Sequence, residues 1–234
     1  MLTLAIDTSC LTASCAICEE GKVLGEITIQ NGKTHSQKII PMAKSLLDLL
    51  DKDFKDMDLF AASIGPGSFT GLRIGVVTVK GLAYSLKRPV CGIPTLDALA
   101  YSVPDFTGLI IPMLDARNNQ VFTAAYHKEQ QTLHKVWPDR GLTLDELMEH
   151  MGASEERVMV LGDAVPLHIQ RLKEAFKERI VEAPPTLFTP RAASCAILAE
   201  KAYLSNQGVN AFELEPLYLR KSQAERMKDL SSEN

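Results

Sequence analysis

The stretch Ser63-Ile-Gly-Pro-Gly-Ser-Phe-Thr-Gly-Leu-Arg-Ile-Gly75 joins two apolar runs of different length and period. The run before it, at 59–64, is short and ends at a glycine, which is typical of a buried strand. The run after it, at 72–86, has apolar residues at helical spacing. Pro66 fixes its own φ and keeps the preceding glycine out of helical geometry, and Ser68 can cap the first helical turn. The stretch therefore predicts a strand, a stiff glycine corner and a helix.

The corner matches neither of two common phosphate-binding motifs. A dinucleotide loop needs G-x-G-x-x-G, and here Gly71 comes one residue late. A Walker loop needs Gly-Lys-Ser/Thr, and Lys80 lies too deep in the helix. A corner without a ligand and a corner close to a phosphate both stay open. For the second interpretation the candidate contacts at the corner are Gly65, Gly67, Ser68 and Arg73.

Composition places the chain among ordinary globular proteins. Its 234 residues are 46% hydrophobic and 23% charged, and its net charge is −4. A chain with this balance is a poor binder of nucleic acid by itself, because phosphate binding depends on clustered Lys and Arg. No apolar run approaches the roughly 20 residues of a membrane span, and the N-terminus has no secretory signal. We therefore expect a cytoplasmic protein with no membrane contact.

The cysteines and histidines indicate neither disulfide nor metal chemistry. Five cysteines in a chain of this length do not form a disulfide framework. Cys15 and Cys18 have C-x-x-C spacing, but a strand would turn their thiols to opposite faces. The five histidines form no H-E-x-x-H or H-x-x-x-H pair. We therefore expect no metal site.

The order of predicted elements is partly repeated along the chain. Three strands, a helix, a strand, a helix, a strand and a helix come first. Three strands, a helix, a strand and helices follow them. This order predicts a duplicated α/β unit with an N-terminal lobe at 1–103, a C-terminal lobe at 104–220 and a polar tail at 221–234. The last helix of the second lobe can pack back on the first lobe.

Two helices of the first lobe have more apolar or small surface than one core needs. The helix predicted at 34–50 is apolar over far more than the ~100° stripe of a surface helix. In the corner helix, Gly71 and Gly75 lie four residues apart, which allows another backbone to approach closely. We expect these helices to meet a second neighbour, either the core or another subunit. Arg73 can face a nucleotide, a tRNA phosphate or an acidic residue of a partner, and we expect the last of these. The candidate interface residues are Ile39, Met42, Ala43, Leu46, Gly71, Ile74, Gly75, Thr78 and Leu82.

A polar turn follows the first strand. Asp7, Thr8 and Ser9 place a carboxylate and two hydroxyls at the end of that strand. Such a carboxylate can hold Mg²⁺ or a water near a phosphate. A solvated turn with local side-chain hydrogen bonds explains the same pattern, so both interpretations stay open.

Three motifs together resemble the TsaB family, formerly called YeaZ. They are the turn at 7–9, the corner at 63–75 and Pro216-Leu-Tyr-Leu-Arg220, and they occur in order over nearly the whole chain. The resemblance implies an α/β, two-lobed actin-like ATPase fold, as in actin and Hsp70. It also implies participation in making threonylcarbamoyladenosine beside the anticodon of tRNAs that read codons beginning with adenine. It names no certain cofactor, but it allows ATP or ADP with Mg²⁺ to bind within an assembled complex.

The chain departs at two places from TsaD, the catalytic relative of that family. The two metal-binding histidines of TsaD would fall at Asp97 and Tyr101, and an aspartate with a tyrosine cannot replace them as ligands. The nucleotide loop of TsaD would fall at 161–165, where Asp163 would repel a phosphate. The resemblance therefore implies a subunit with no catalytic residues that partners TsaD. It also implies TsaE as a further partner, indirect contact with tRNA, and a homodimer in isolation.

Three alternatives stay open. A stand-alone actin-like kinase or ATPase would use Asp7 as its metal carboxylate and the corner near the phosphate. A peptidase, a label once given to relatives of this fold, lacks support from any Ser/His/Asp order or zinc pair. A purely homodimeric interaction module would need no partner enzyme.

Overall fold

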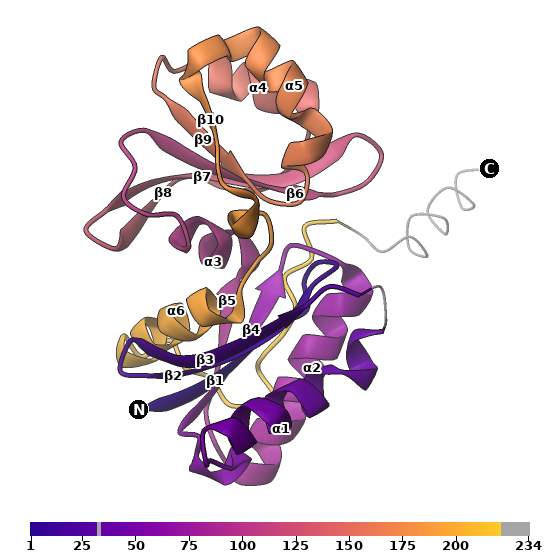
Figure 1. Ribbon diagram of the computed structural model, residues 1–234, viewed down its shortest axis with the longest axis vertical. Coiled ribbons are helices and arrows are strands. Elements are labelled where there is room, and N and C mark those ends of the chain that lie inside the picture. The colour runs from indigo at the N-terminus through magenta and orange to yellow at the C-terminus, as the bar shows by residue number, and fades with distance from the viewer. Residues whose placement is uncertain (32–33, 221–234) are drawn as a thin grey trace, which may run out of the picture.

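The computed structural model describes residues 1–31 and 34–220 and has two lobes, one above the other in Figure 1. The polar tail expected at 221–234 lies outside the described residues. Each lobe is built on a five-stranded sheet. The first sheet contains β1 (Leu2–Asp7), β2 (Ala13–Glu19), β3 (Lys22–Ile29), β4 (Leu59–Gly65) and β5 (Val90–Pro94). The second sheet contains β6 (Leu109–Asp115), β7 (Gln120–Glu129), β8 (Thr132–Thr143), β9 (Val158–Leu161) and β10 (Ile180–Glu182).

The two sheets have the same topology. Their strand orders are β3-β2-β1-β4-β5 and β8-β7-β6-β9-β10. In each sheet the first three strands of the chain pair antiparallel, and the last two join parallel beside the first. This repetition confirms the predicted duplicated α/β unit.

The last helix of each half packs on the sheet of the other half. The helices are α1 (Ile39–Leu49), α2 (Phe69–Leu86), α3 (Thr95–Tyr101), α4 (Leu144–Gly152), α5 (Val165–Phe176) and α6 (Ala192–Leu204). Helices α1 and α2 cover one face of the first sheet and α6 covers the other, as Figure 1 shows. Helix α3 shares a core with β6 and β7 of the second sheet. Each half of the chain therefore completes the core of the other.

Small residues allow α6 to approach the first sheet closely. Ala192, Ala196 and Ala199 of α6 are fully buried against alanines of β1, β2 and β4. Short side chains on both surfaces bring the helix close to the strands and increase the dispersion contacts between them.

Two elements differ from the sequence-based expectation. The helix expected at 34–50 begins as a single 3-10 turn at His35–Gln37, and α1 proper starts at Ile39. Pro41 then lies in the first turn, where a helix needs no donor from its backbone. Strand β10 was not predicted, because a strand of three residues gives too short a pattern to read.

The corner brings α2 directly against the turn that follows β1. Ser68 caps α2 as predicted, accepting a hydrogen bond from the Gly71 amide at 3.2 Å. The Thr8 hydroxyl donates to the Gly71 carbonyl at 2.7 Å. A Cβ atom at Gly71 would lie 2.0 Å from the Thr8 carbonyl oxygen, and one at Gly67 would lie 2.4 Å from that of Ser9. Only glycine permits this approach.

Residues 208–220 form an extended segment, here called the strap, that runs along the first lobe and then crosses to the second (yellow in Figure 1). Val209 exchanges two backbone hydrogen bonds with Val90, of 2.9 and 3.0 Å. The Leu217 amide donates to the Ile64 carbonyl at 2.7 Å. The Arg220 guanidinium donates to the Ala116 carbonyl of the second lobe at 2.9 Å. The strap therefore ties the corner to both lobes.

The close approach at the corner predicts a contrast between two glycines of α2. We expect Gly71→Ala to lower the free energy of unfolding by about 1–3 kcal/mol, because the new methyl group overpacks against Thr8. We expect Gly81→Ala, with open space around it, to raise that free energy by about 1 kcal/mol through helix propensity. Urea unfolding followed by circular dichroism measures both. Equal changes in the two variants would contradict the close approach.

Candidate functional site

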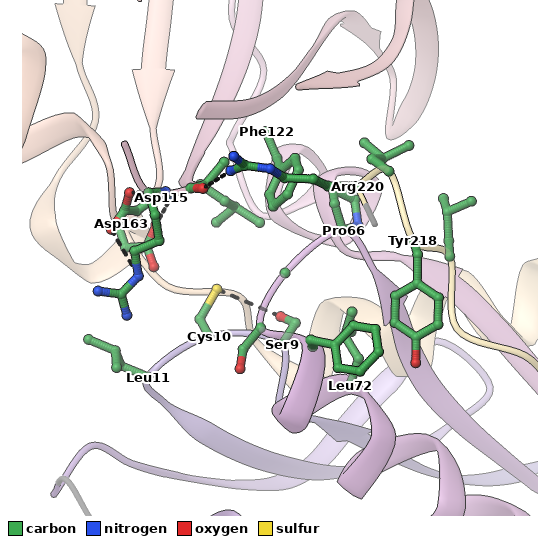
Figure 2. A pocket seen from close by; sticks show the side chains of 18 of the residues that line it. Ser9, Cys10, Leu11, Pro66, Leu72, Asp115, Phe122, Asp163, Tyr218 and Arg220 are labelled. Atoms are coloured by element: carbon green, nitrogen blue, oxygen red, sulfur yellow. Dashed lines mark hydrogen bonds and ion pairs between the residues drawn. The ribbon is translucent and has the colours of Figure 1, made fainter. Parts of the chain in front are cut away.

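A cavity of about 460 Å³ lies between the lobes. The first lobe contributes the turn after β1 and the corner, and the second lobe contributes the β6–β7 hairpin and the loop after β9. The end of the strap closes one side, where Figure 2 shows Tyr218 and Arg220 opposite Asp115 and Asp163. The carboxyl ends of parallel strands from both sheets meet here, which is the usual position of a ligand site in α/β proteins.

Asp7 lies beneath this cavity rather than in it. The residue is 1% exposed. One carboxylate oxygen accepts hydrogen bonds from the Ser9 amide at 3.0 Å and the Ser9 hydroxyl at 2.8 Å, and the other accepts from the Ser63 hydroxyl. Burial raises the pKa of the Asp7 carboxyl, and these hydrogen bonds oppose the rise. Both oxygens are thus used inside the fold, which leaves the carboxylate poorly placed to hold Mg²⁺.

The other candidate phosphate contacts come together, but mainly to hold the corner. Ser9, Gly67 and Ser68 line the cavity, whereas Thr8 and Gly65 are not among its lining residues. The Ser68 amide donates to the Ser9 carbonyl at 2.7 Å, and the Ser68 hydroxyl caps α2. The polar groups that sequence alone offered to a phosphate are therefore largely paired with one another.

Arg73 has partners within the chain. Its guanidinium lies 4.0 Å from the centre of the Phe69 ring, and its Nε donates to the Tyr218 hydroxyl at 3.1 Å. The Phe69 and Tyr218 rings are stacked with centroids 4.6 Å apart. Arg73 therefore fastens the strap to α2, a role that the sequence did not suggest.

Two carboxylates of the second lobe face the cavity. An Asp163 oxygen accepts from the Asp115 amide at 2.9 Å, and an Asp115 oxygen accepts from the Arg117 amide at 2.8 Å. Burial raises the pKa of the Asp163 carboxyl, although the hydrogen bond from the Asp115 amide opposes this. Sequence reasoning missed Asp115, whose position directly at the end of a strand was the available signal. Arg117 and Arg220 line the same cavity, and the Arg117 guanidinium lies 3.9 Å from the other Asp115 oxygen, so the cavity presents both signs of charge to a ligand.

Asp97 and Tyr101 of α3 belong to contacts that join elements of the fold. The Asp97 carboxylate accepts from the Tyr126 hydroxyl at 2.7 Å and pairs with the Lys135 ammonium at 2.7 Å. Lys201 donates to the Tyr101 hydroxyl at 3.2 Å. Within residues 1–31 and 34–220, no three His, Cys, Asp or Glu side chains are grouped as a metal site.

The two cysteines with C-x-x-C spacing lie on opposite faces of β2, as predicted. Cys15 belongs to the core beneath α1 and α2, and Cys18 to the core beneath α6. Burial raises the pKa of each thiol to about 12. Both thiols stay protonated at neutral pH, which makes them poor nucleophiles and poor metal ligands.

The structure corrects the expected interface at six of its nine residues. Ile39, Met42, Ala43 and Leu46 of α1 are buried in the core of the first lobe. Gly71 and Gly75 of α2 pack against Thr8, and a Cβ at Gly75 would lie 2.5 Å from the Thr8 hydroxyl. These residues serve the lobe's own core because both helices cover the same face of the sheet.

The remaining three expected interface residues are Ile74, Thr78 and Leu82, which are half-buried. The outer faces of α1 and α2 also carry apolar side chains that sequence reasoning did not select. The exposed examples on these two helices are Ile40, Leu49, Val77 and Tyr84. No helix among the described residues has the length and apolar character needed to cross a membrane.

Comparison with known proteins gives one consistent family. The family described as tRNA N6-adenosine threonylcarbamoyltransferase, TsaD, matches residues 22–228. The tRNA threonylcarbamoyladenosine biosynthesis protein TsaB of Bacillus subtilis is 33% identical over 96% of both chains. The protein of the same name from Escherichia coli is 27% identical over 96% of both chains. A crystal structure from Pseudomonas aeruginosa, described as similar to peptidase YeaZ, matches with a TM-score of 0.81 and 28% identity over 94% of this chain and 99% of that one.

The buried carboxyl of Asp7 predicts a specific pH dependence of stability. Burial holds its pKa in the folded state above the ordinary value of an aspartate, so the folded chain binds the proton more tightly than the unfolded chain. The contribution of the protonated Asp7 carboxyl to the free energy of unfolding is therefore largest at low pH, and it decreases as the pH rises through the folded-state pKa. We expect Asp7→Asn to remove this decrease, since the Ser63 hydroxyl can accept from the new amide.

Urea unfolding of both proteins between about pH 4 and about pH 7 measures this effect as the difference between the two curves. The wild-type protein should lose stability relative to Asp7→Asn as pH rises. Parallel curves would show that Asp7 ionises as easily in the folded chain as in the unfolded one.

Proposed function

The chain belongs to the TsaB family, whose two-lobed actin-like fold it has, and from this premise we propose that it serves threonylcarbamoyladenosine synthesis in tRNA as a non-catalytic partner of a TsaD-type transferase. The relatives named for this biosynthesis are matched over 96% of their length. In this proposal the modified adenosine is the one beside the anticodon of tRNAs that read codons beginning with adenine.

The proposed non-catalytic role rests on one observation, which is how the carboxylates in and beneath the cleft are bonded. In an actin-like ATPase this cleft holds nucleotide and metal, whereas here Asp7 is buried beneath the floor, and Asp115 and Asp163 share the second-lobe wall with Arg117. Asp97 is paired with Tyr126 and Lys135. The carboxylates of Asp7 and Asp97 are thus engaged in holding the fold, which favours a scaffold over a stand-alone kinase.

The outer faces of α1 and α2 are the proposed contact with the TsaD-type partner. Val77 is 66% exposed although it is apolar, and Ile40 and Leu49 of α1 are exposed too. Large apolar side chains left exposed on helices that cover the same face of a sheet favour a protein interface there. In the absence of the transferase, the same faces would pair two copies of the chain. A TsaE-type ATPase and tRNA would join the assembly mainly through the other subunits, consistent with the net charge of −4.

Reconstitution of tRNA modification tests the proposed function. Purified chain, the TsaD-type protein and the remaining components of the same organism are assayed for threonylcarbamoyladenosine, with and without this chain. Modification should require the chain, and the chain alone should hydrolyse no ATP. Turnover of ATP by the isolated chain would instead support the stand-alone ATPase.

The proposed contact predicts the effect of one substitution on α2. We expect Val77→Asp to weaken binding to the TsaD-type protein by at least about tenfold, because a carboxylate would have to be desolvated at an apolar contact. The side chain points away from the core, so the fold should be kept. Calorimetric titration with the transferase measures the affinity.

The matched control is Leu167→Asp on α5 of the second lobe. Leu167 is 65% exposed and apolar, as Val77 is, but lies on another surface. It should leave the affinity unchanged. Equal affinities for both variants would place the contact elsewhere.

A further inference from the structure

A groove of about 780 Å³ lies on the first lobe, and none of its lining residues borders the cleft. It runs between the last turns of α2 and α6 on one side and the strap on the other. Ala83, Val209 and Ala211 give it an apolar floor, since all three are buried or half-buried. Tyr84 and Phe212 form one rim and are 64% and 71% exposed. Such a cluster of exposed aromatic side chains is unusual for a free surface.

The groove is held open by contacts that do not depend on a ligand. Lys80 donates to the carbonyls of Phe212 and Leu214 at 3.1 and 3.0 Å, which fixes the strap against α2. The Tyr84 and Phe212 rings meet edge to face with centroids 5.0 Å apart. Gly208 lies beneath the Tyr203 ring, where a Cβ would be 2.5 Å from a ring carbon. A preformed groove of this kind loses little conformational entropy on binding.

The charge of the groove is opposite to that of the chain. Among the described residues that line it, Lys87 and Arg88 are the charged ones, and both are cations. The whole chain has a net charge of −4. Arg88 uses one nitrogen to donate to the Lys55 carbonyl at 3.3 Å, so its other donors are available to a ligand. An occupant should therefore combine apolar groups with negative charge.

We propose that this groove binds a short acidic segment of a protein partner. An apolar side chain of the segment lies on the floor beside Tyr84 and Phe212, and its carboxylates face Lys87 and Arg88. RNA matches the groove less well, because two cations neutralise few phosphates and the acidic chain repels a polyanion. The Tyr84 and Phe212 rings, set edge to face, also offer no pair of parallel platforms for stacked bases.

Nuclear magnetic resonance of the full, isotope-labelled chain tests the proposal. The probe is the capped peptide Glu-Asp-Leu-Phe-Asp-Glu, and its comparison has Gln and Asn in place of Glu and Asp. The amides of Gly208, Asn210 and Phe212 should shift saturably with the acidic peptide at concentrations on the order of 1 mM. The neutral peptide should bind about tenfold more weakly. Absence of these shifts, or tighter binding of a ten-residue uridine oligonucleotide at the same salt, would overturn the proposal.

Two helix-end lysines provide a matched pair of variants. Lys87 ends α2 and Lys177 ends α5, both are exposed, and their φ angles are 54° and 50°. Lys87→Glu and Lys177→Glu change the net charge of the chain equally. We expect Lys87→Glu to weaken the affinity for the acidic peptide by about tenfold and Lys177→Glu to leave that affinity unchanged. Equal weakening by both would mean that the peptide responds only to the overall charge, which contradicts a specific groove.

A second pair tests the apolar part of the groove. Phe212→Ala removes an exposed ring from the rim, and Leu167→Ala removes an equally exposed side chain from the second lobe. Phe212→Ala should weaken the affinity for the acidic peptide by about tenfold, whereas Leu167→Ala should leave it unchanged. If Phe212→Ala bound the peptide as tightly as the wild type does, the Phe212 ring would not be part of the site. The proposed position of the peptide's apolar side chain would then be wrong.

Discussion

The close contact between the N-terminal turns of α2 and the turn after β1 is the constraint on which the first lobe depends. Gly67 and Gly71 bring backbone within a distance that no side chain would allow, and the Thr8 hydroxyl closes the contact. Asp7 then finds all its donors in Ser9 and Ser63, beneath the same contact. The turn, the corner and the buried carboxylate form one unit, so none of them is free to serve a ligand independently.

The same unit explains why the turn and the corner offer few free polar groups to a ligand. The cleft keeps its position at the ends of the parallel strands, because the duplicated topology places it there. The carboxylates that line it accept hydrogen bonds from neighbouring backbone amides, and so belong to the structure of the loops that carry them. The fold persists through packing and backbone pairing, which do not require the chemistry of the site.

The sequence predicted the repeated order of elements well, because strand and helix periodicity is a local property. It also predicted the corner, where Ser68 caps α2 and the glycines permit tight packing. It failed on where apolar surfaces go: Ile39 and Leu46 were expected at a subunit contact and lie in the core. Periodicity shows how much of a helix is apolar, but the partner of each face is set by tertiary packing. For the same reason the sequence did not indicate that Arg73 bonds to Tyr218, which comes from the far end of the chain.

The exchange of final helices between the halves has a consequence for how the chain matures during translation. Helix α6 covers one face of the first sheet, and its residues begin at Ala192. When only the first half of the chain has been synthesised, one apolar face of the first sheet is therefore uncovered. Helix α3 does not cover it, because α3 packs on the other sheet. The core of the N-terminal half is therefore complete only after almost the entire polypeptide has been made, and until then its uncovered apolar face is open to aggregation.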